Sequence, residues 1–82
     1  MAIIVFKGWK VGMRGIPFVL LLREKTDISL KRAKDIKERI VDNETIELTV
    51  PNDAVANEIV IEARELGVVC EIKEKSQEGL SL

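Results

Sequence analysis

A row of glutamates and a single cysteine are the residues of this 82-residue chain from which catalytic chemistry could be built, because histidine is absent. Glu58, Glu62 and Glu65 are four and three residues apart, which places them on one face of a helix. Paired carboxylates can transfer protons or bind a hard cation. No glycine-rich phosphate-binding motif accompanies them, and such a row is more often a solvated acidic face. We therefore expect no metal and no cofactor.

Cys70 lies in a segment that we expect to be a buried strand, which favours a small apolar structural role over that of a nucleophile. No serine lies in a nucleophile-elbow motif. A lone cysteine excludes an intrachain disulfide and fits a reducing compartment, so we expect a cytoplasmic protein. The longest apolar run, Ile16–Leu22, has seven residues. Because about 20 are needed to cross a membrane, we expect no membrane partner. These observations predict a protein that is not an enzyme.

Basic side chains are concentrated in residues 31–39, where five of nine residues are Lys or Arg. Such a density can bind nucleic acid. The sequence pI of about 5.5 and the absence of tyrosine for base stacking argue against that function. Residues 1–40 carry ten basic and four acidic side chains, whereas residues 41–82 carry three and ten. We expect either a bipolar surface or two halves that neutralise each other.

Residues 15–40 predict two short helices joined by a tight corner. Pro17 suits the first turn of a helix, and the next five residues, 18–22, are all apolar. A helix of a soluble protein buries one stripe, so part of this apolar helix is expected at the surface. Ser29 is the expected N-cap of the second helix, where apolar residues at three- and four-residue steps mark a buried face. These apolar residues are Leu30, Ala33, Ile36 and Ile40.

The remaining segments predict a sheet and one covering helix. Residues 2–6 form a continuous apolar strand, residues 45–50 alternate strictly, and residues 68–73 form a last strand. Between the second and third strands, Asn52 or Asp53 caps a third helix. The order β-α-α-β-α-β predicts an α+β two-layer sandwich, in which a three-stranded antiparallel sheet carries three helices on one face.

We expect a single domain over residues 1–75 and a disordered tail at residues 76–82. The only tryptophan, Trp9, either packs over an edge of the core or serves as an exposed anchor for a partner. The residues expected in the core are Ile4, Leu22, Leu30, Ala33, Ile36, Ile46, Leu48, Ile59, Ala63, Leu66, Val68 and Ile72.

Residues 22–37, LREKTDISLKRAKDIK, resemble the signature of the C-terminal domain of the bacterial ribosomal stalk protein, large-subunit protein seven/twelve. That family shows an Arg, a Thr three residues on, a Leu-x-Leu-Lys step, and then Ala-Lys-Asp followed by an aliphatic residue. The matching positions are Arg23, Thr26, Ile28, Leu30, Lys31, Ala33, Lys34, Asp35 and Ile36. Residues 65–72, ELGVVCEI, resemble the family's helix end and last strand, so the likeness covers roughly residues 3–73.

The resemblance implies a domain that recruits translational GTPases or other ribosome-associated factors through the exposed side of its first helix and a Lys on its second. The residues that this carries over are Ile16, Phe18, Val19, Arg23 and Lys34, to which we add Leu20 and Lys31 from the apolar and basic segments. The family has a Lys where Leu20 stands, so we expect either a different partner or self-association through this helix. Alternatively, Leu20 turns inward and Leu21 or Phe18 takes the exposed place. Because these 82 residues do not include the family's dimerisation domain and hinge, we expect a stand-alone relative.

Two alternatives to this protein-binding function stay open. The first is a nucleic-acid-binding protein that uses the basic second helix. The second is a relative of the Clp protease adaptor, whose fold the stalk domain shares. That family's Asn-Asp pair and pocket His have no equivalent in this chain.

Overall fold

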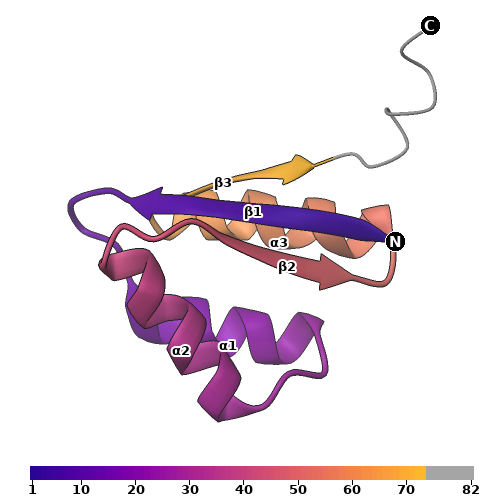
Figure 1. Ribbon diagram of the computed structural model, residues 1–82, viewed down its shortest axis with the longest axis horizontal. Coiled ribbons are helices and arrows are strands. Elements are labelled where there is room, and N and C mark those ends of the chain that lie inside the picture. Colours follow the sequence, from indigo (N-terminus) through magenta and orange to yellow (C-terminus); the bar gives the residue numbers. More distant parts are fainter. Residues whose placement is uncertain (74–82) are drawn as a thin grey trace, which may run out of the picture.

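A computed structural model describes residues 1–73 of the chain. Within residues 1–73, three strands and three helices follow one another in the predicted order β-α-α-β-α-β, so the predicted α+β class is confirmed (Figure 1). The predicted tail, residues 76–82, lies outside the described residues. The elements are β1 (Ala2–Trp9), α1 (Gly15–Lys25), α2 (Leu30–Val41), β2 (Ile46–Val50), α3 (Asp53–Glu65) and β3 (Val68–Lys73).

The sheet is antiparallel throughout, with β1 in the centre between β2 and β3 (Figure 1). The apolar run at the start of the chain fits this central place, because Ile4 pairs with Leu48 on one side and with Ile72 on the other. The strand continues to Trp9, beyond its predicted end, since a bulge between Phe6 and Gly8 shifts the pairing with β3. A bulge lets a strand accommodate an extra residue without ending.

The helix ends follow local hydrogen bonding. Ser29 Oγ accepts the backbone N–H of Arg32 at 3.1 Å, and Asn52 Oδ1 accepts that of Val55 at 2.9 Å, so both predicted N-caps form. The first turn of α1 has no such cap and no acidic residue. The end of α1 is closed by Thr26, whose hydroxyl donates to the carbonyl of Leu22 at 2.7 Å.

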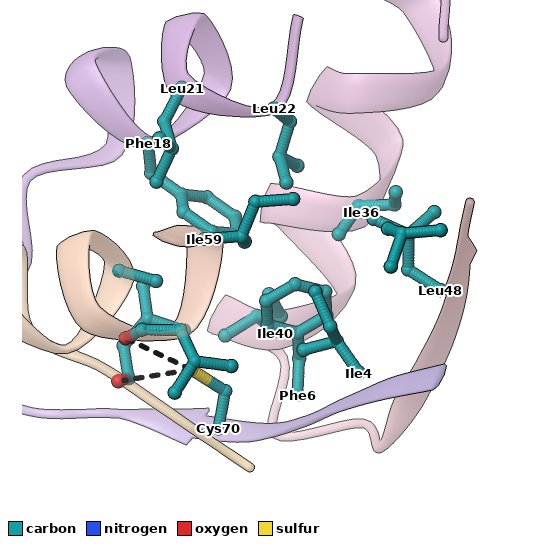
Figure 2. Packing of buried hydrophobic residues seen from close by; sticks show 14 of the residues in the cluster. Ile4, Phe6, Phe18, Leu21, Leu22, Ile36, Ile40, Leu48, Ile59 and Cys70 are labelled. Carbon is teal, nitrogen blue, oxygen red and sulfur yellow. Dashed lines mark hydrogen bonds between the residues drawn. The ribbon is translucent and has the colours of Figure 1, made fainter. Parts of the chain in front are cut away.

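All three helices share one core with the inner face of the sheet. The rings of Phe6 and Phe18 meet edge to face, with centroids 5.5 Å apart and planes at 79°. Figure 2 shows Phe18 and Leu22 of α1 pointing towards Ile59 and the strand residues, so α1 reaches the sheet although it packs mainly against α2 and α3.

Eleven of the twelve predicted core residues are buried or half-buried in this cluster. Leu30 is the exception, because it is the first residue of α2 and its side chain is 40% exposed. It lies one and two helical turns before Lys34 and Lys37, at the rim of the helix pair rather than beneath it. The prediction that Leu30 is a core residue is therefore wrong.

Candidate functional site

Helix α1 presents two large apolar side chains to solvent. Ile16 and Leu20, one helical turn apart, are 76% and 58% exposed, and we call this pair the α1 ridge. Leu20 therefore does not turn inward. The prediction that Phe18 and Val19 lie on the exposed side is wrong, because they are only 0% and 6% exposed. Phe18 is held under α1 by its contact with Phe6.

A shallow groove of about 340 Å³ separates the α1 ridge from α2. Val19 lies in this groove but is covered by its neighbours. The aliphatic stem of Lys37 passes over Gly15, where an added Cβ would lie 3.3 Å from Lys37 Cδ. The absence of a side chain at Gly15 thus lets a lysine of α2 approach the first turn of α1. The groove is lined by Gly15, Ile16, Val19, Leu20, Leu30, Lys34, Lys37 and Glu38.

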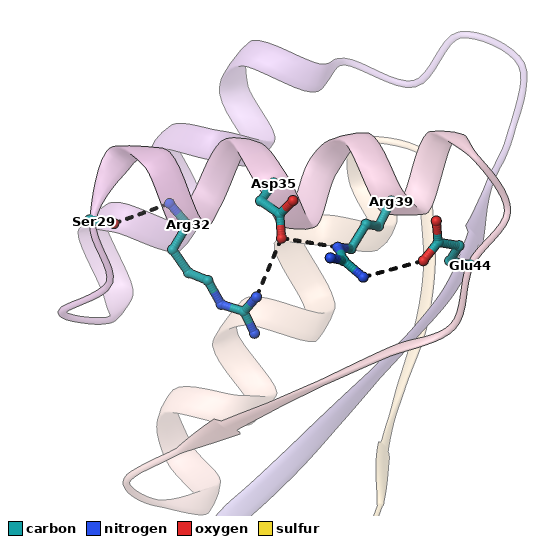
Figure 3. A network of polar contacts seen from close by, with 5 residues as sticks. All are labelled: Ser29, Arg32, Asp35, Arg39 and Glu44. Carbon is teal, nitrogen blue, oxygen red and sulfur yellow. Dashed lines mark hydrogen bonds and ion pairs between the residues drawn. The ribbon is translucent and has the colours of Figure 1, made fainter.

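Only part of the basic segment of α2 carries charge that is available to a partner. Asp35 Oδ2 lies 3.5 Å from Arg32 Nη1 and 3.0 Å from Arg39 Nε (Figure 3). Arg39 also pairs with Glu44 at 3.5 Å. These arginines are thereby partly neutralised. The sequence carried a signal for this, since Asp35 is three residues after Arg32 and four before Arg39.

Three lysines of α2 make no ion pair among residues 1–73. Lys31, Lys34 and Lys37 recur every third residue, and we call them the lysine row. Lys34 and Lys37 line the groove beside the α1 ridge, whereas Lys31 lies farther along the surface. The two predicted lysine positions, 31 and 34, are thus both exposed. Lys37 was expected only as part of the basic segment of the nucleic-acid alternative and not among the partner-binding residues, to which the three-residue spacing could have added it.

An acidic groove of about 320 Å³ lies on the other side of the ridge, between α1 and α3. Its carboxylates are Glu24, Glu62 and Glu65. Glu62 is also 3.8 Å from Lys25 Nζ, which pairs more closely with Glu58 at 3.0 Å. The hydrogen bond and charge of Glu58, followed by the charge of Glu62, raise the pKa of Lys25. The glutamate row thus lies along α3 beside α1.

Arg23 is exposed and belongs to the basic side of α1. Around the helix axis, Arg23 lies on the same side of Leu20 as Ile16 does, because it follows Leu20 by three residues. Glu24 follows Leu20 by four residues and therefore lies on the opposite side, towards α3. The α1 ridge therefore runs between two oppositely charged borders. We call Arg23, Lys34 and Lys37 the basic flank, and Glu24, Glu62 and Glu65 the acidic flank. Glu38 is the one carboxylate among the residues that line the groove between the α1 ridge and α2.

Cys70 and Trp9 are both held in structural positions. Burial raises the pKa of the Cys70 thiol to about 11, so it is protonated at neutral pH. Its Sγ lies 3.9 Å from the carbonyl oxygen of Val60 (Figure 2). Trp9 is 40% exposed, but its indole N–H donates to the carbonyl of Val41 at 3.0 Å. This bond ties β1 to the end of α2, as expected for a tryptophan packed over a core edge.

Within residues 1–73, no group of three or more Cys, Asp or Glu side chains is placed to hold a metal ion. No helix in the same part of the chain is long and apolar enough to cross a membrane. Comparison with protein-family models, curated proteins and solved structures finds no match to the chain. The similarity to the ribosomal stalk domain therefore stays a prediction from the sequence.

Proposed function

We propose that this chain is a non-catalytic protein-binding module that binds its partner through the α1 ridge and the lysine row. The observation that carries the proposal is the exposure of Ile16 and Leu20 directly beside lysines with no ion-pair partner among the described residues. Large apolar side chains bordered by charge are typical of surfaces that bind proteins, because burial supplies affinity and charge supplies orientation.

The charge of the groove indicates the chemistry of the partner. Lys34 and Lys37 favour carboxylates, and the uncapped first turn of α1 adds the positive end of a helix dipole beside Lys37. The ridge in turn favours apolar side chains. We infer that the partner presents apolar residues flanked by acidic ones. The similarity to the stalk domain makes a translational GTPase of the cytoplasm the first partner to test.

The alternative of nucleic-acid binding has less support from the same helix. Of the five basic residues in this segment, Arg32 and Arg39 are partly neutralised by Asp35 and Glu44, and the three lysines have no ion-pair partner among residues 1–73. Fewer available cations mean fewer phosphate contacts and a weaker, less salt-dependent association. Both phenylalanines are buried, which leaves Trp9 as the one exposed aromatic side chain that could stack on a base.

Site-specific photo-crosslinking tests the proposal with a matched control. Leu20 and Ile61 are equally exposed, at 58% and 59%, but Ile61 lines neither groove of α1. A photo-reactive residue at position 20 should capture a protein partner in cells that position 61 does not capture. Lys34→Glu should remove this adduct, because it reverses the charge beside the ridge.

Affinity for the captured protein, or for a purified translational GTPase, gives the quantitative test. Leu20→Lys should weaken binding by about tenfold or more, because burying a leucine contributes about 1.5–3 kcal/mol. The matched change Ile61→Lys should alter the dissociation constant by less than about twofold. Identical adducts at both positions, or adducts only to nucleic acid, would refute the proposal.

A further inference from the structure

We propose that the α1 ridge also binds a second copy of this chain, in a two-fold symmetric dimer whose two α1 helices lie side by side and parallel. This proposal goes beyond the protein-binding function and does not depend on it. Its basis is that a single surface carries an apolar centre with a basic flank on one side and an acidic flank on the other.

Symmetry decides how such a surface can meet itself. Two identical faces pack against each other only across a two-fold axis that lies in the plane of the interface. An axis parallel to α1 exchanges the two sides of the helix, so each basic flank lies opposite the partner copy's acidic flank. An axis at right angles to α1 places each flank opposite its own equivalent. Charge complementarity therefore selects the parallel arrangement.

The same arrangement matches the apolar residues. With the axis parallel to α1, Ile16 lies opposite Ile16 of the second copy, and Leu20 lies opposite Leu20. Two exposed side chains that are otherwise in water are then buried on each copy. The two helix dipoles also lie parallel, which opposes the contact. That effect is limited to the first and last turns, whereas the charged flanks border the whole helix.

The contact is small, because α1 has 11 residues and is about 16 Å long. Stable interfaces bury about 800 Å² on each partner, so we expect a weak dimer that forms only at high protein concentration. Because the dimer covers the ridge, self-association would compete with a partner that binds the same residues.

Disulfide trapping tests the orientation. In the parallel dimer, Ile16→Cys places two thiols opposite each other, and the native Cys70 does not interfere because it is buried. In an antiparallel dimer centred on the ridge, Ile16 lies opposite Leu20 of the second copy, so a mixture of Ile16→Cys and Leu20→Cys chains would form the 16–20 disulfide fastest. In the parallel dimer these two positions are about 6 Å apart along the helices, so the 16–16 disulfide should form faster than the 16–20 disulfide. Ile61→Cys is the control, since it is comparably exposed and measures random collision. We expect the disulfide dimer of Ile16→Cys to form at least about tenfold faster.

Charge reversal tests the complementarity independently, with sedimentation velocity as the measurement. The wild-type chain should increase in average mass with concentration. Lys34→Glu with Lys37→Glu makes both flanks acidic, and Glu62→Lys with Glu65→Lys makes both flanks basic. Each double variant alone should stay monomeric to about tenfold higher concentration, whereas an equimolar mixture should associate.

Three results would overturn the dimer: a wild-type chain that stays monomeric at about 1 mM, a mixture that associates no better than its components, or Ile16→Cys that crosslinks no faster than Ile61→Cys. Circular dichroism checks that each variant folds, and all substituted positions are on the surface or half-buried. If the wild-type chain is monomeric, the dimer is refuted but the proposed binding of another protein is not. The two proposals can therefore be refuted independently.

Discussion

Replacing Phe18 by alanine should destabilise the fold far more than replacing Leu20 by alanine, although the two residues are neighbours in one apolar run. Phe18 is fully buried and its ring packs edge to face on Phe6, so truncation leaves a cavity above the sheet. Such truncations cost about 3–5 kcal/mol. Leu20 is about two fifths buried. Since a fully buried leucine contributes about 1.5–3 kcal/mol, Leu20→Ala should cost about 1 kcal/mol or less.

Urea unfolding gives the assay. An 82-residue domain is stable by about 4–12 kcal/mol, so Phe18→Ala can unfold a large fraction of the chain, and Phe18→Leu provides a milder step of about 1–2 kcal/mol. Circular dichroism follows all helices, whereas Trp9 fluorescence follows the contact between β1 and Val41 at the end of α2. Coincidence of the two transitions establishes that unfolding is two-state, which the comparison of free energies requires.

A double-mutant cycle then isolates the contact between the two rings. Phe6→Leu and Phe18→Leu should couple by about 0.5–1.5 kcal/mol, the range measured for aromatic pairs. If Phe18→Ala and Leu20→Ala lower the free energy of unfolding equally, or if Phe18→Ala costs less than about 1 kcal/mol, the inner and outer sides of α1 have been assigned incorrectly.

Two further predictions concern the backbone and the pH dependence. Gly67→Ala should destabilise the fold by at least about 1 kcal/mol more than Gly12→Ala in urea unfolding. Both glycines have a positive φ (91° and 94°), but only at Gly67 would a Cβ lie 2.9 Å from the backbone of Met13; equal costs would contradict this clash. The Cys70 thiol, with its pKa raised to about 11, stabilises the fold fully below about pH 8.5, and this contribution is lost as the pH rises towards 11. The free energy of unfolding should therefore fall across this interval, and a fall that is just as steep in Cys70→Ala would refute the assignment.

The elements with a clear periodicity could be predicted from the sequence. In β2, residues 46, 48 and 50 turn inward and residues 47 and 49 turn outward, as strict alternation requires. Helix α2 has a strongly amphipathic pattern, so Ala33, Ile36 and Ile40 were placed correctly. The short polar capping residues Ser29 and Asn52 marked where helices begin. In each case, a local rule and the global packing demand the same arrangement.

The orientation of α1 could not be predicted, because apolar residues surround the whole helix and leave no periodic signal. Whether Phe18 or Leu20 faces out depends on where α2 and α3 lie, which is long-range information. The ion pairs that Arg32 and Arg39 make with Asp35 could have been predicted, since the spacing of three and four residues is visible in the sequence. The location of the acidic flank again needed the fold, because α3 is remote from α1 in the chain but packs beside it.

The position of α1 in the fold explains why its outer face is available for binding. Helices α2 and α3 pack on the central strand β1, whereas α1 packs mainly on those two helices and reaches the sheet through Phe18. Its inner residues therefore hold the fold together, while Ile16 and Leu20 contribute little to stability. If the proposed binding surface is correct, substitutions at Ile16 and Leu20 should change affinity at small cost to the fold. Substitutions at the buried residues 18, 19, 21 and 22 should also destabilise the fold. The proposed binding surface on α1 could thus change in charge without a change in the β-α-α-β-α-β framework.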